Sequence, residues 1–355
     1  MPTLFDPLTL GDITLANRII MAPLTRCRAS EGRVPNELMR EYYTQRASAG
    51  LILTEATAVT PMGVGYPDTP GLWSDDQVAG WKAITDSVHA AGGRIFAQLW
   101  HVGRVSHPDF LNGEAPVSAS AIALQGEGRV PSGRKPYTVP RALTLEEIPG
   151  VIETYREGAE NAKRAGFDGV EVHGANGYLP DQFLRDGSNH RTDKYGGSNK
   201  NRARFLLEAT DAAISVWGAG RVGVHLSPRD MPSQPISDSD PAATFGYVAH
   251  ALGERKIAFL LTRESLEGGP RYSPAMRKAF GGVFIANEGF TPEQARQVLD
   301  NGEADAVCWG KQFIANPDLP RRLAQNGPFN TPNPDTFYGP GAAGYTDYPF
   351  LEAGE

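Results

Sequence analysis

The sequence has few cysteines, no long apolar run and no excess of basic residues, and each shortage excludes a class of protein. Its two cysteines, Cys27 and Cys308, are too few to ligate an iron–sulfur cluster and do not suggest a disulfide framework. No apolar run approaches the roughly 18 residues of a membrane-spanning helix. The formal net charge of −7 disfavours a nucleic-acid or anionic-membrane surface, which would need a basic face.

The N-terminal segment and the composition are typical of a cytoplasmic enzyme. Residues 1–15 carry acidic but no basic side chains, so we do not expect a signal peptide. The chain of 355 residues is 40% hydrophobic and can bury a large core. Because α/β barrels often exceed about 250 residues as one unit, we interpret residues 1–355 as a single domain.

Short apolar segments alternate with helical patterns along the chain. Most are apolar at consecutive residues, as expected for parallel strands covered on both faces. Eight β/α units in series predict a closed (β/α)8, or TIM, barrel. The expected strands are 18–24, 51–59, 94–100, 169–175, 222–228, 258–264, 283–289 and 306–310, and the clearest helices are 145–166 and 291–302. In the second helix, Thr291 is the expected N-cap and Gly302 the residue after the C-cap.

Three segments go beyond a minimal barrel. Residues 4–16 resemble a β-hairpin that would close the bottom of the barrel. Residues 101–145 form a long loop, rich in glycine, proline and serine, after the third strand, and loops of this length are usually functional. The tail, residues 331–355, is rich in proline, glycine and aromatic residues, and we expect it to dock onto the barrel.

Polar residues stand at the carboxyl ends of all eight predicted strands, the end at which TIM barrels carry their active sites. For one such residue alone, a loop contact is the better interpretation, but eight strand ends together indicate a site. They are Thr25, Arg26, Glu55, Thr57, Gln98, Trp100, His101, His173, Asn176, Tyr178, His225, Ser227, Arg263, Glu264, Asn287, Glu288, Gly310 and Lys311.

The segment HGANGY, residues 173–178, is the sharpest of these ends. His173 and Asn176 can both donate hydrogen bonds toward one point, and Tyr178 adds a weak acid, which suits polarisation of a carbonyl or nitro oxygen. From this segment alone, a core histidine, a turn asparagine and a packed tyrosine are an equally good interpretation. No carboxylate, cysteine or second histidine stands nearby at metal-ligand spacing, so we expect no metal.

The seventh and eighth strand ends contain Asn287, Glu288 and Gly289, then Gly310 and Lys311. TIM barrels often bind a phosphate group there through backbone N–H groups, and glycines allow close approach. Each glycine alone is equally consistent with a simple turn, so the motif has low specificity.

Together with these strand ends, longer segments of the chain resemble the old yellow enzyme family of FMN-dependent ene-reductases over nearly its whole length. The similar segments are NRIIMAPLTR (17–26), YYTQRASAGLILTEAT (42–57), GRIFAQLWHVGR (93–104), residues 165–198 around HGANGY, FIANPDLPRR (313–322) and GYTDYPFL (344–351). The resemblance implies FMN as cofactor, NAD(P)H as reductant and an activated alkene as substrate, in a monomer or homodimer.

The resemblance also implies roles for individual residues. Pro23 and Leu24 would contact the flavin through their backbone, Thr25 through its hydroxyl, and Ala56 and Gln98 on the pyrimidine side. One subgroup of the family has cysteine where Thr25 stands, so this chain resembles the threonine-bearing subgroup, with Cys27 structural. For the substrate, the implied set is His173 and Asn176 as oxygen-binding donors, Tyr178 as proton donor, and Trp100 and Tyr345 as pocket walls.

Three positions depart from the common family pattern. His225 stands where arginine usually faces the reduced flavin, so a neutral ring would stabilise the anion less and a protonated ring could replace the arginine. Glu288 replaces glycine, and we expect its side chain to point to solvent while its N–H contacts the phosphate. Lys311 replaces arginine, which exchanges a fork of donors for a point charge. The alternative function is therefore a flavin-poor barrel that binds enones or phenols without turnover.

Overall fold

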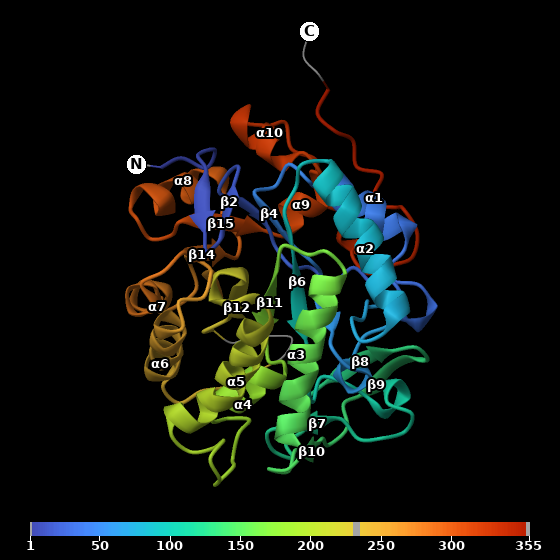
Figure 1. The fold of residues 1–355 in the computed structure, drawn as a ribbon, viewed down its shortest axis with the longest axis vertical. Helices are drawn as coiled ribbons and strands as arrows, with labels where there is room; N and C mark the ends of the chain where they lie inside the picture. The colour runs from blue at the N-terminus through green and yellow to red at the C-terminus, as the bar shows by residue number, and fades with distance from the viewer. Residues whose placement is uncertain (1, 230–234, 353–355) are drawn as a thin grey trace.

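Eight parallel strands close into a barrel in the computed structural model, which describes residues 2–229 and 235–352 (Figure 1). Each barrel strand pairs with the next, and the β6–β11 pair completes the ring. The strands are β3 (Ile19–Met21), β4 (Leu51–Leu53), β6 (Ile95–Trp100), β11 (Gly169–His173), β12 (Val222–Leu226), β13 (Phe259–Arg263), β14 (Phe284–Asn287) and β15 (Ala306–Trp309). The predicted (β/α)8 barrel is confirmed, and every strand lies within its predicted range.

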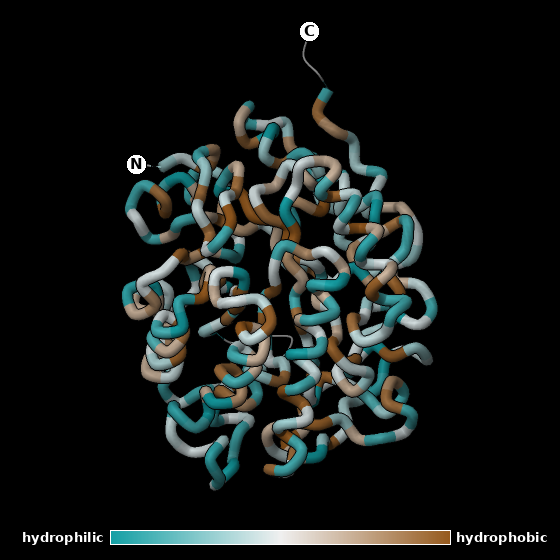
Figure 2. Tube along the Cα trace, viewed as in Figure 1, coloured by the Kyte–Doolittle hydropathy of each residue, from teal (hydrophilic) through white to brown (hydrophobic). Residues whose placement is uncertain are grey.

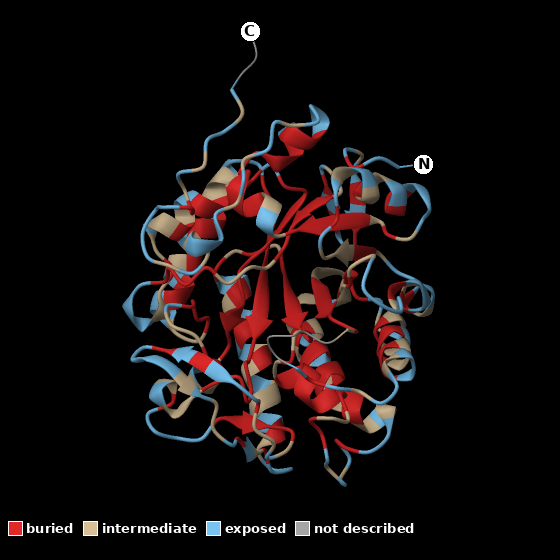
Figure 3. Ribbon diagram, turned by 180° about the vertical axis from the view of Figure 1, so that it is seen from behind, coloured by how far each residue is buried: buried red, intermediate tan, exposed pale blue. Residues whose placement is uncertain are grey.

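Helices cover the outside of the barrel, and Figure 3 shows the buried strands in the middle of the molecule with helices around them. A capping box at Thr291 begins α8, and Gly302 has a left-handed φ of 68° just after its C-cap, as predicted. Among the residues that the structure describes, no helix is long and apolar enough to cross a membrane. The helices are α1 (Glu37–Gln45), α2 (Asp75–Ala90), α3 (Ile148–Arg164), α4 (Leu179–Leu184), α5 (Asn199–Trp217), α6 (Pro241–Glu254), α7 (Ser273–Phe280), α8 (Pro292–Asp300), α9 (Lys311–Ala315) and α10 (Leu319–Ala324).

The bottom of the barrel is filled by an apolar layer. The hairpin of β1 (Leu8–Leu10) and β2 (Ile13–Leu15) packs its buried leucines and isoleucine against the inward-facing residues of the barrel strands. Phe96 and Phe259 occupy the space beside two glycines: a Cβ on Gly169 would lie 2.4 Å from the first ring, and one on Gly223 would lie 2.1 Å from the second. The predicted hairpin therefore closes this end, and Figure 2 shows the hydrophobic segments gathered toward the middle of the molecule.

The long loop after β6 and the C-terminal tail are both ordered on the barrel. The loop contains the antiparallel pair β8 (Glu127–Val130) and β9 (Gly133–Pro136), and the parallel pair β7 (Val117–Ser118) and β10 (Arg141–Ala142). Shortly after β4 in the chain, β5 (Thr57–Ala58) pairs with the end of β6. In the tail, the carbonyls of Phe337 and Gly344 accept hydrogen bonds from buried Arg26 at 3.0 and 2.8 Å. The predicted docking of the tail is confirmed.

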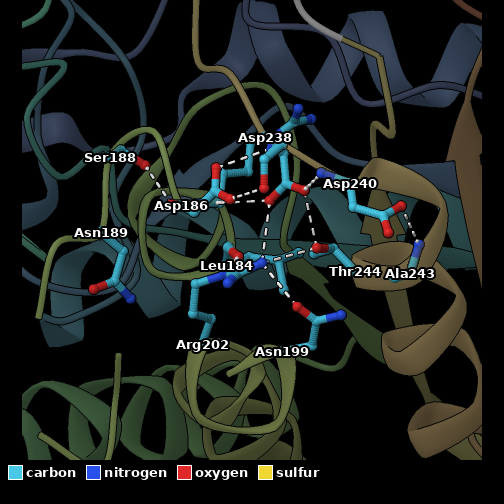
Figure 4. Close-up of polar contacts among 12 residues, drawn as sticks. Leu184, Asp186, Ser188, Asn189, Asn199, Arg202, Asp238, Asp240, Ala243 and Thr244 are labelled. Carbon is cyan, nitrogen blue, oxygen red and sulfur yellow. Dashed lines mark hydrogen bonds and ion pairs between the residues drawn. The ribbon is translucent and has the colours of Figure 1, made fainter. Parts of the chain in front are cut away.

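The segment that leads into α6, residues 235–240, is anchored by the polar network in Figure 4. The carboxylate of Asp238 accepts hydrogen bonds from the Thr244 hydroxyl at 3.0 Å and from the Asp186 backbone N–H at 3.3 Å, and it pairs with Arg202 at 3.5 Å. Arg202 in turn donates to the Leu184 carbonyl at 2.8 Å. These contacts tie the start of α6 to α4 and α5, the two helices that follow the HGANGY segment.

Candidate active site

Side chains alternate along the barrel strands between the helix layer and the barrel interior. On β11, Val170 and Val172 pack in the outer core, while Glu171 and His173 take the inward positions that Gly169 begins. Above the apolar bottom layer, the inward positions become polar at the carboxyl ends of the strands. They are occupied by Gln98 and Trp100 on β6, Glu171 and His173 on β11, His225 on β12, Arg263 on β13 and Asn287 on β14.

His173 lies at the centre of this polar layer as a neutral imidazole. Its Nδ1 accepts a hydrogen bond from the Ala175 backbone N–H at 3.3 Å, which leaves the ring proton on Nε2. Burial, and to a smaller extent the charge of Arg263, lowers the pKa of His173 to about 3. Its ring lies parallel to that of His225, with centroids 5.3 Å apart, and meets the edge of the Tyr178 ring at 5.0 Å.

Asn176 is held at its backbone and at its side chain. Its φ of 60° is left-handed, a conformation that asparagine tolerates better than most residues, and its N–H donates to the Ser227 hydroxyl at 2.8 Å. Its Oδ1 accepts a hydrogen bond from Arg263 Nη1 at 3.1 Å. The carbonyl end of the amide is thereby engaged, so the NH₂ group is the end that can donate to a ligand.

Tyr178 is half-buried in an aromatic cluster. Its hydroxyl lies 3.0 Å from that of Tyr66, and its ring meets the edge of the Trp100 ring at 5.1 Å. Tyr66 lies parallel to Trp100 at 5.6 Å. Tyr66 is not among the residues predicted from the sequence, because it stands in a loop after β5 and has no strand-end position. The one available signal was an aromatic residue in the glycine-rich run GVGYP.

Below this cluster, Gln98 links Glu171 to His225. Its Nε2 donates to Glu171 Oε2 at 2.6 Å and lies 3.4 Å from His225 Nδ1. Burial raises the pKa of Glu171 to about 8, and burial, then His173 and Arg263, lower the pKa of His225 well below its usual value. In this environment His225 is therefore neutral.

The residues expected on the cofactor side lie around the ends of β3, β14 and β15. Pro23, Leu24 and Thr25 are half-buried, and the Leu24 side chain would lie 3.1 Å from a Cβ on Gly310. Ala56 is buried after β4, and Asn287 Nδ2 donates to the Cys308 carbonyl at 2.7 Å. Gly289, at a φ of 74°, and Lys311, the first residue of α9, are exposed.

The Glu288 side chain is 41% exposed, in keeping with the expectation that it points to solvent, and it also forms an ion pair with Nε of Arg263. This pair was not predicted, because the sequence does not show that the arginine at the end of β13 lies against the residue after β14. Arg263 was predicted only as one of the strand-end residues.

Tyr345 lies elsewhere than expected. The structure stacks it on Tyr42 of α1, with ring centroids 4.0 Å apart, and the guanidinium groups of Arg26 and Arg28 lie over its ring. This cation–aromatic stack holds Tyr345 against α1, and in the described part of the chain no ring contact joins it to the HGANGY cluster. Tyr338, seven residues earlier in the same tail, is exposed and lies within electrostatic reach of Arg263.

The sequence pattern of the NADH:flavin oxidoreductase / NADH oxidase family matches residues 3–330. The chain belongs to this family. Among solved structures, it resembles an old yellow enzyme homologue from Zymomonas mobilis (47% identity, TM-score 0.96, 99% of this chain and 100% of that one) and morphinone reductase in complex with tetrahydroNAD (48%, 0.94, 99% and 98%). Among curated proteins, 12-oxophytodienoate reductase 1 of Oryza sativa subsp. japonica is 44% identical over 98% of this chain and 93% of its own length.

As an FMN-dependent oxidoreductase of the old yellow enzyme family, the protein takes FMN as cofactor and a nicotinamide as reductant. Its barrel top fits a polar, planar group. Within the described residues, His225 Nε2 and Glu171 Oε1 are buried without a hydrogen-bond partner, although buried polar atoms are rarely left unpaired. Burial also raises the pKa of the Cys27 thiol to about 12, so this cysteine is protonated and has no thiolate with which to react.

Proposed function

We propose that the protein reduces the C=C bond of activated alkenes, namely α,β-unsaturated carbonyls, maleimides and nitroalkenes, with nitrate esters or nitroaromatics as further substrates. The observation that carries this proposal is the meeting of two neutral donors, His173 and Asn176, with the hydroxyl of Tyr178 at one strand end. Relatives that are named as reductases of 12-oxophytodienoate and of morphinone support the same reaction class.

The donors bind the substrate oxygen. His173 donates through Nε2, since Nδ1 is occupied by the Ala175 N–H, and Asn176 donates through its NH₂ group. Both groups stabilise the negative charge that develops on this oxygen. Neutral donors suit this role because they bind the neutral product oxygen only weakly, once the negative charge on it has been lost.

Tyr178 delivers the proton to the carbon next to the activating group. Its hydroxyl shares a hydrogen bond with that of Tyr66, so Tyr66 can donate to the Tyr178 oxygen as its proton leaves. Trp100 packs against both tyrosines and shapes the pocket. The expected pocket role of Tyr345 stays indirect, since this side chain supports the tail that carries Tyr338.

FMN, when bound, supplies the hydride chemistry, taking a hydride from NAD(P)H and giving it to the alkene. The chain's own residues orient and surround the cofactor. We assign these contacts to Pro23, Leu24, Thr25, Ala56, Gln98 and His225 around the ring, and to Glu288, Gly289, Gly310 and Lys311 near the phosphate.

The absorption spectrum of the purified protein tests this proposal. We expect a visible flavin band that NADPH bleaches and that 2-cyclohexen-1-one restores, with the saturated ketone as product. A colourless protein that FMN cannot reconstitute would instead support a barrel that binds enones or phenols without turnover. A flavin that NADPH reduces but that no alkene, maleimide or nitroalkene reoxidises would overturn the substrate class alone.

A further inference from the structure

Arg263 joins three parts of the barrel top. It is the last residue of β13, and its side chain is 27% exposed. Its Nη1 donates to Asn176 Oδ1, which belongs to the segment after β11, and its Nε pairs with the carboxylate of Glu288, which follows β14. One guanidinium thus connects a proposed substrate-binding amide to a carboxylate on the opposite side of β13.

Glu288 occupies a backbone position that disfavours it. Its φ is 102°, in the region that glycine adopts far more readily than any residue with a Cβ. Residues held in such conformations persist only when the surrounding structure demands them, and they often occur at functional sites. The contact that the Glu288 side chain makes there is the ion pair with Arg263, so the carboxylate serves to hold the guanidinium.

Arg263 is also the cation that contacts the donor cluster. His173 and His225 are neutral, and the charge of Arg263 contributes to keeping them so. Lys311 is exposed, and no ion pair or hydrogen bond joins it to these side chains in the part of the chain that the structure describes. The acidic groups nearby include Glu288, Glu171 beneath the cluster, and Asp181, whose Oδ2 accepts a hydrogen bond from the Gly177 N–H at 2.9 Å while its Oδ1 pairs with Arg185 at 2.8 Å.

We propose that Arg263 is a positioning residue for alkene reduction, which fixes the Asn176 amide with its NH₂ group toward the substrate oxygen and places a positive charge near that oxygen. Glu288 anchors it. This inference rests on the proposed function of His173 and Asn176 as the oxygen-binding pair. An amide that could rotate would present its carbonyl to the oxygen part of the time, and that orientation repels developing negative charge.

Substitution of Arg263 by methionine, which removes charge and donors but keeps much of the apolar stem, is the primary test. We expect Arg263→Met to lower kcat/KM for 2-cyclohexen-1-one about 10- to 100-fold, the range for losing a charged hydrogen bond, mostly through kcat. Arg263→Lys should restore part of the rate, and Glu288→Gln should lower it less than Arg263→Met. The matched control is Arg271→Met, since Arg271 pairs with Glu303 at 2.8 Å and is similarly half-buried.

A second measurement separates electrostatic positioning from simple bracing of the strands. The apparent pKa of bound p-nitrophenol, read from its phenolate absorbance, should be below its value in water in the wild-type holoenzyme. It should rise toward that value in Arg263→Met and stay unchanged in Arg271→Met. Rates are expressed per bound FMN, and where the methionine variant retains no FMN, Arg263→Lys and Glu288→Gln serve in both measurements.

The outcomes distinguish this inference from the proposed function. If the wild type reduces the enone but Arg263→Met matches the Arg271→Met control in rate and in p-nitrophenol pKa, Arg263 only braces the strands and the inference is wrong. If the wild type fails to reduce any activated alkene, the proposed function is wrong, and the p-nitrophenol measurement alone decides whether Arg263 favours an anionic oxygen.

Discussion

The two ends of the barrel are built from the same strands, but the bottom is apolar and tightly packed whereas the top is lined by polar side chains. At the bottom, the hairpin leucines, Phe96 and Phe259 fill the interior, and glycines on neighbouring strands leave room for the two rings. At the top, the inward positions carry histidine, glutamine, glutamate and arginine, and some of their polar atoms lack partners among the described residues. The bottom contributes packing, whereas the top presents polar groups that can bind ligands. Burying these polar atoms without hydrogen-bond partners lowers the stability of the fold.

The same alternation of side chains along a strand therefore serves both packing and ligand binding. On β11, Gly169, Glu171 and His173 are successive inward residues, which change from packing partner to buried acid to proposed ligand within five residues. The apolar bottom provides the stability, and the polar top can then be substituted for function. Substitutions at the two ends should therefore affect different measurements.

The largest expected effect is at the top. Tyr178→Phe should slow alkene reduction about 10²- to 10⁴-fold, the usual loss for a general acid, and should leave flavin reduction by NADPH nearly unchanged. Stopped-flow measurement of the two half-reactions checks this. Tyr155→Phe is the control, because the Tyr155 hydroxyl is buried without a partner among the described residues and lies on α3, outside the barrel. An equal slowing of both half-reactions in Tyr178→Phe would contradict its role as proton donor.

The next effect is at the bottom. Phe259→Ala should lower the free energy of unfolding by about 3–5 kcal/mol, because it removes a buried ring beside Gly223 and leaves a cavity. Chemical denaturation of the holoenzyme measures this change. The kcat of the folded variant should stay within a few-fold of the wild-type value. If Phe259→Ala has the same free energy of unfolding as the wild type, packing of the bottom layer does not provide the stability of the barrel.

The third effect lies between the two ends, at Glu171. Its folded-state pKa of about 8 exceeds the ordinary value of 4.5, so the folded protein holds a proton that the unfolded chain releases. This group therefore lowers the free energy of unfolding progressively as pH rises from about 4.5 to about 8. Burial also raises the pKa of Glu55 to about 7, so Glu55 lowers the free energy of unfolding over a similar pH range. Because Glu55 is present in both the wild type and the Glu171→Gln variant, its effect cancels when the two are compared.

Glu171→Gln removes the ionisable group but keeps its shape. Melting temperatures measured from pH 5 to pH 8.5 should show the variant gaining stability relative to the wild type across this range, with the gain complete just above pH 8. If the melting temperatures of the two proteins instead change in parallel with pH, Glu171 has an ordinary pKa. Its position would then not belong to the desolvated polar layer at the top of the barrel.

The sequence was sufficient to predict the barrel because each strand is a short apolar run between glycines, prolines and charges. The hairpin and the Thr291 cap also follow from local patterns. His173, Asn176 and Tyr178 share one segment, so their proximity was predictable. The Arg263–Glu288 pair was not, because it depends on which neighbouring strand ends point at each other. Tyr66 and Tyr345 belong to a loop and a tail, whose positions are fixed by long-range contacts and not by periodicity.

The docked tail has a consequence for how the chain folds during synthesis. Arg26 donates to the carbonyl of Gly344, 318 residues away, and Arg46 donates to that of Tyr345, 299 residues away. These guanidinium groups are fully buried in the finished protein, and these two acceptors become available only after almost the entire chain has left the ribosome. The environment of β3 and α1 is therefore completed only near the end of synthesis, although these elements are among the first to be made. Contacts of such long sequence separation slow folding.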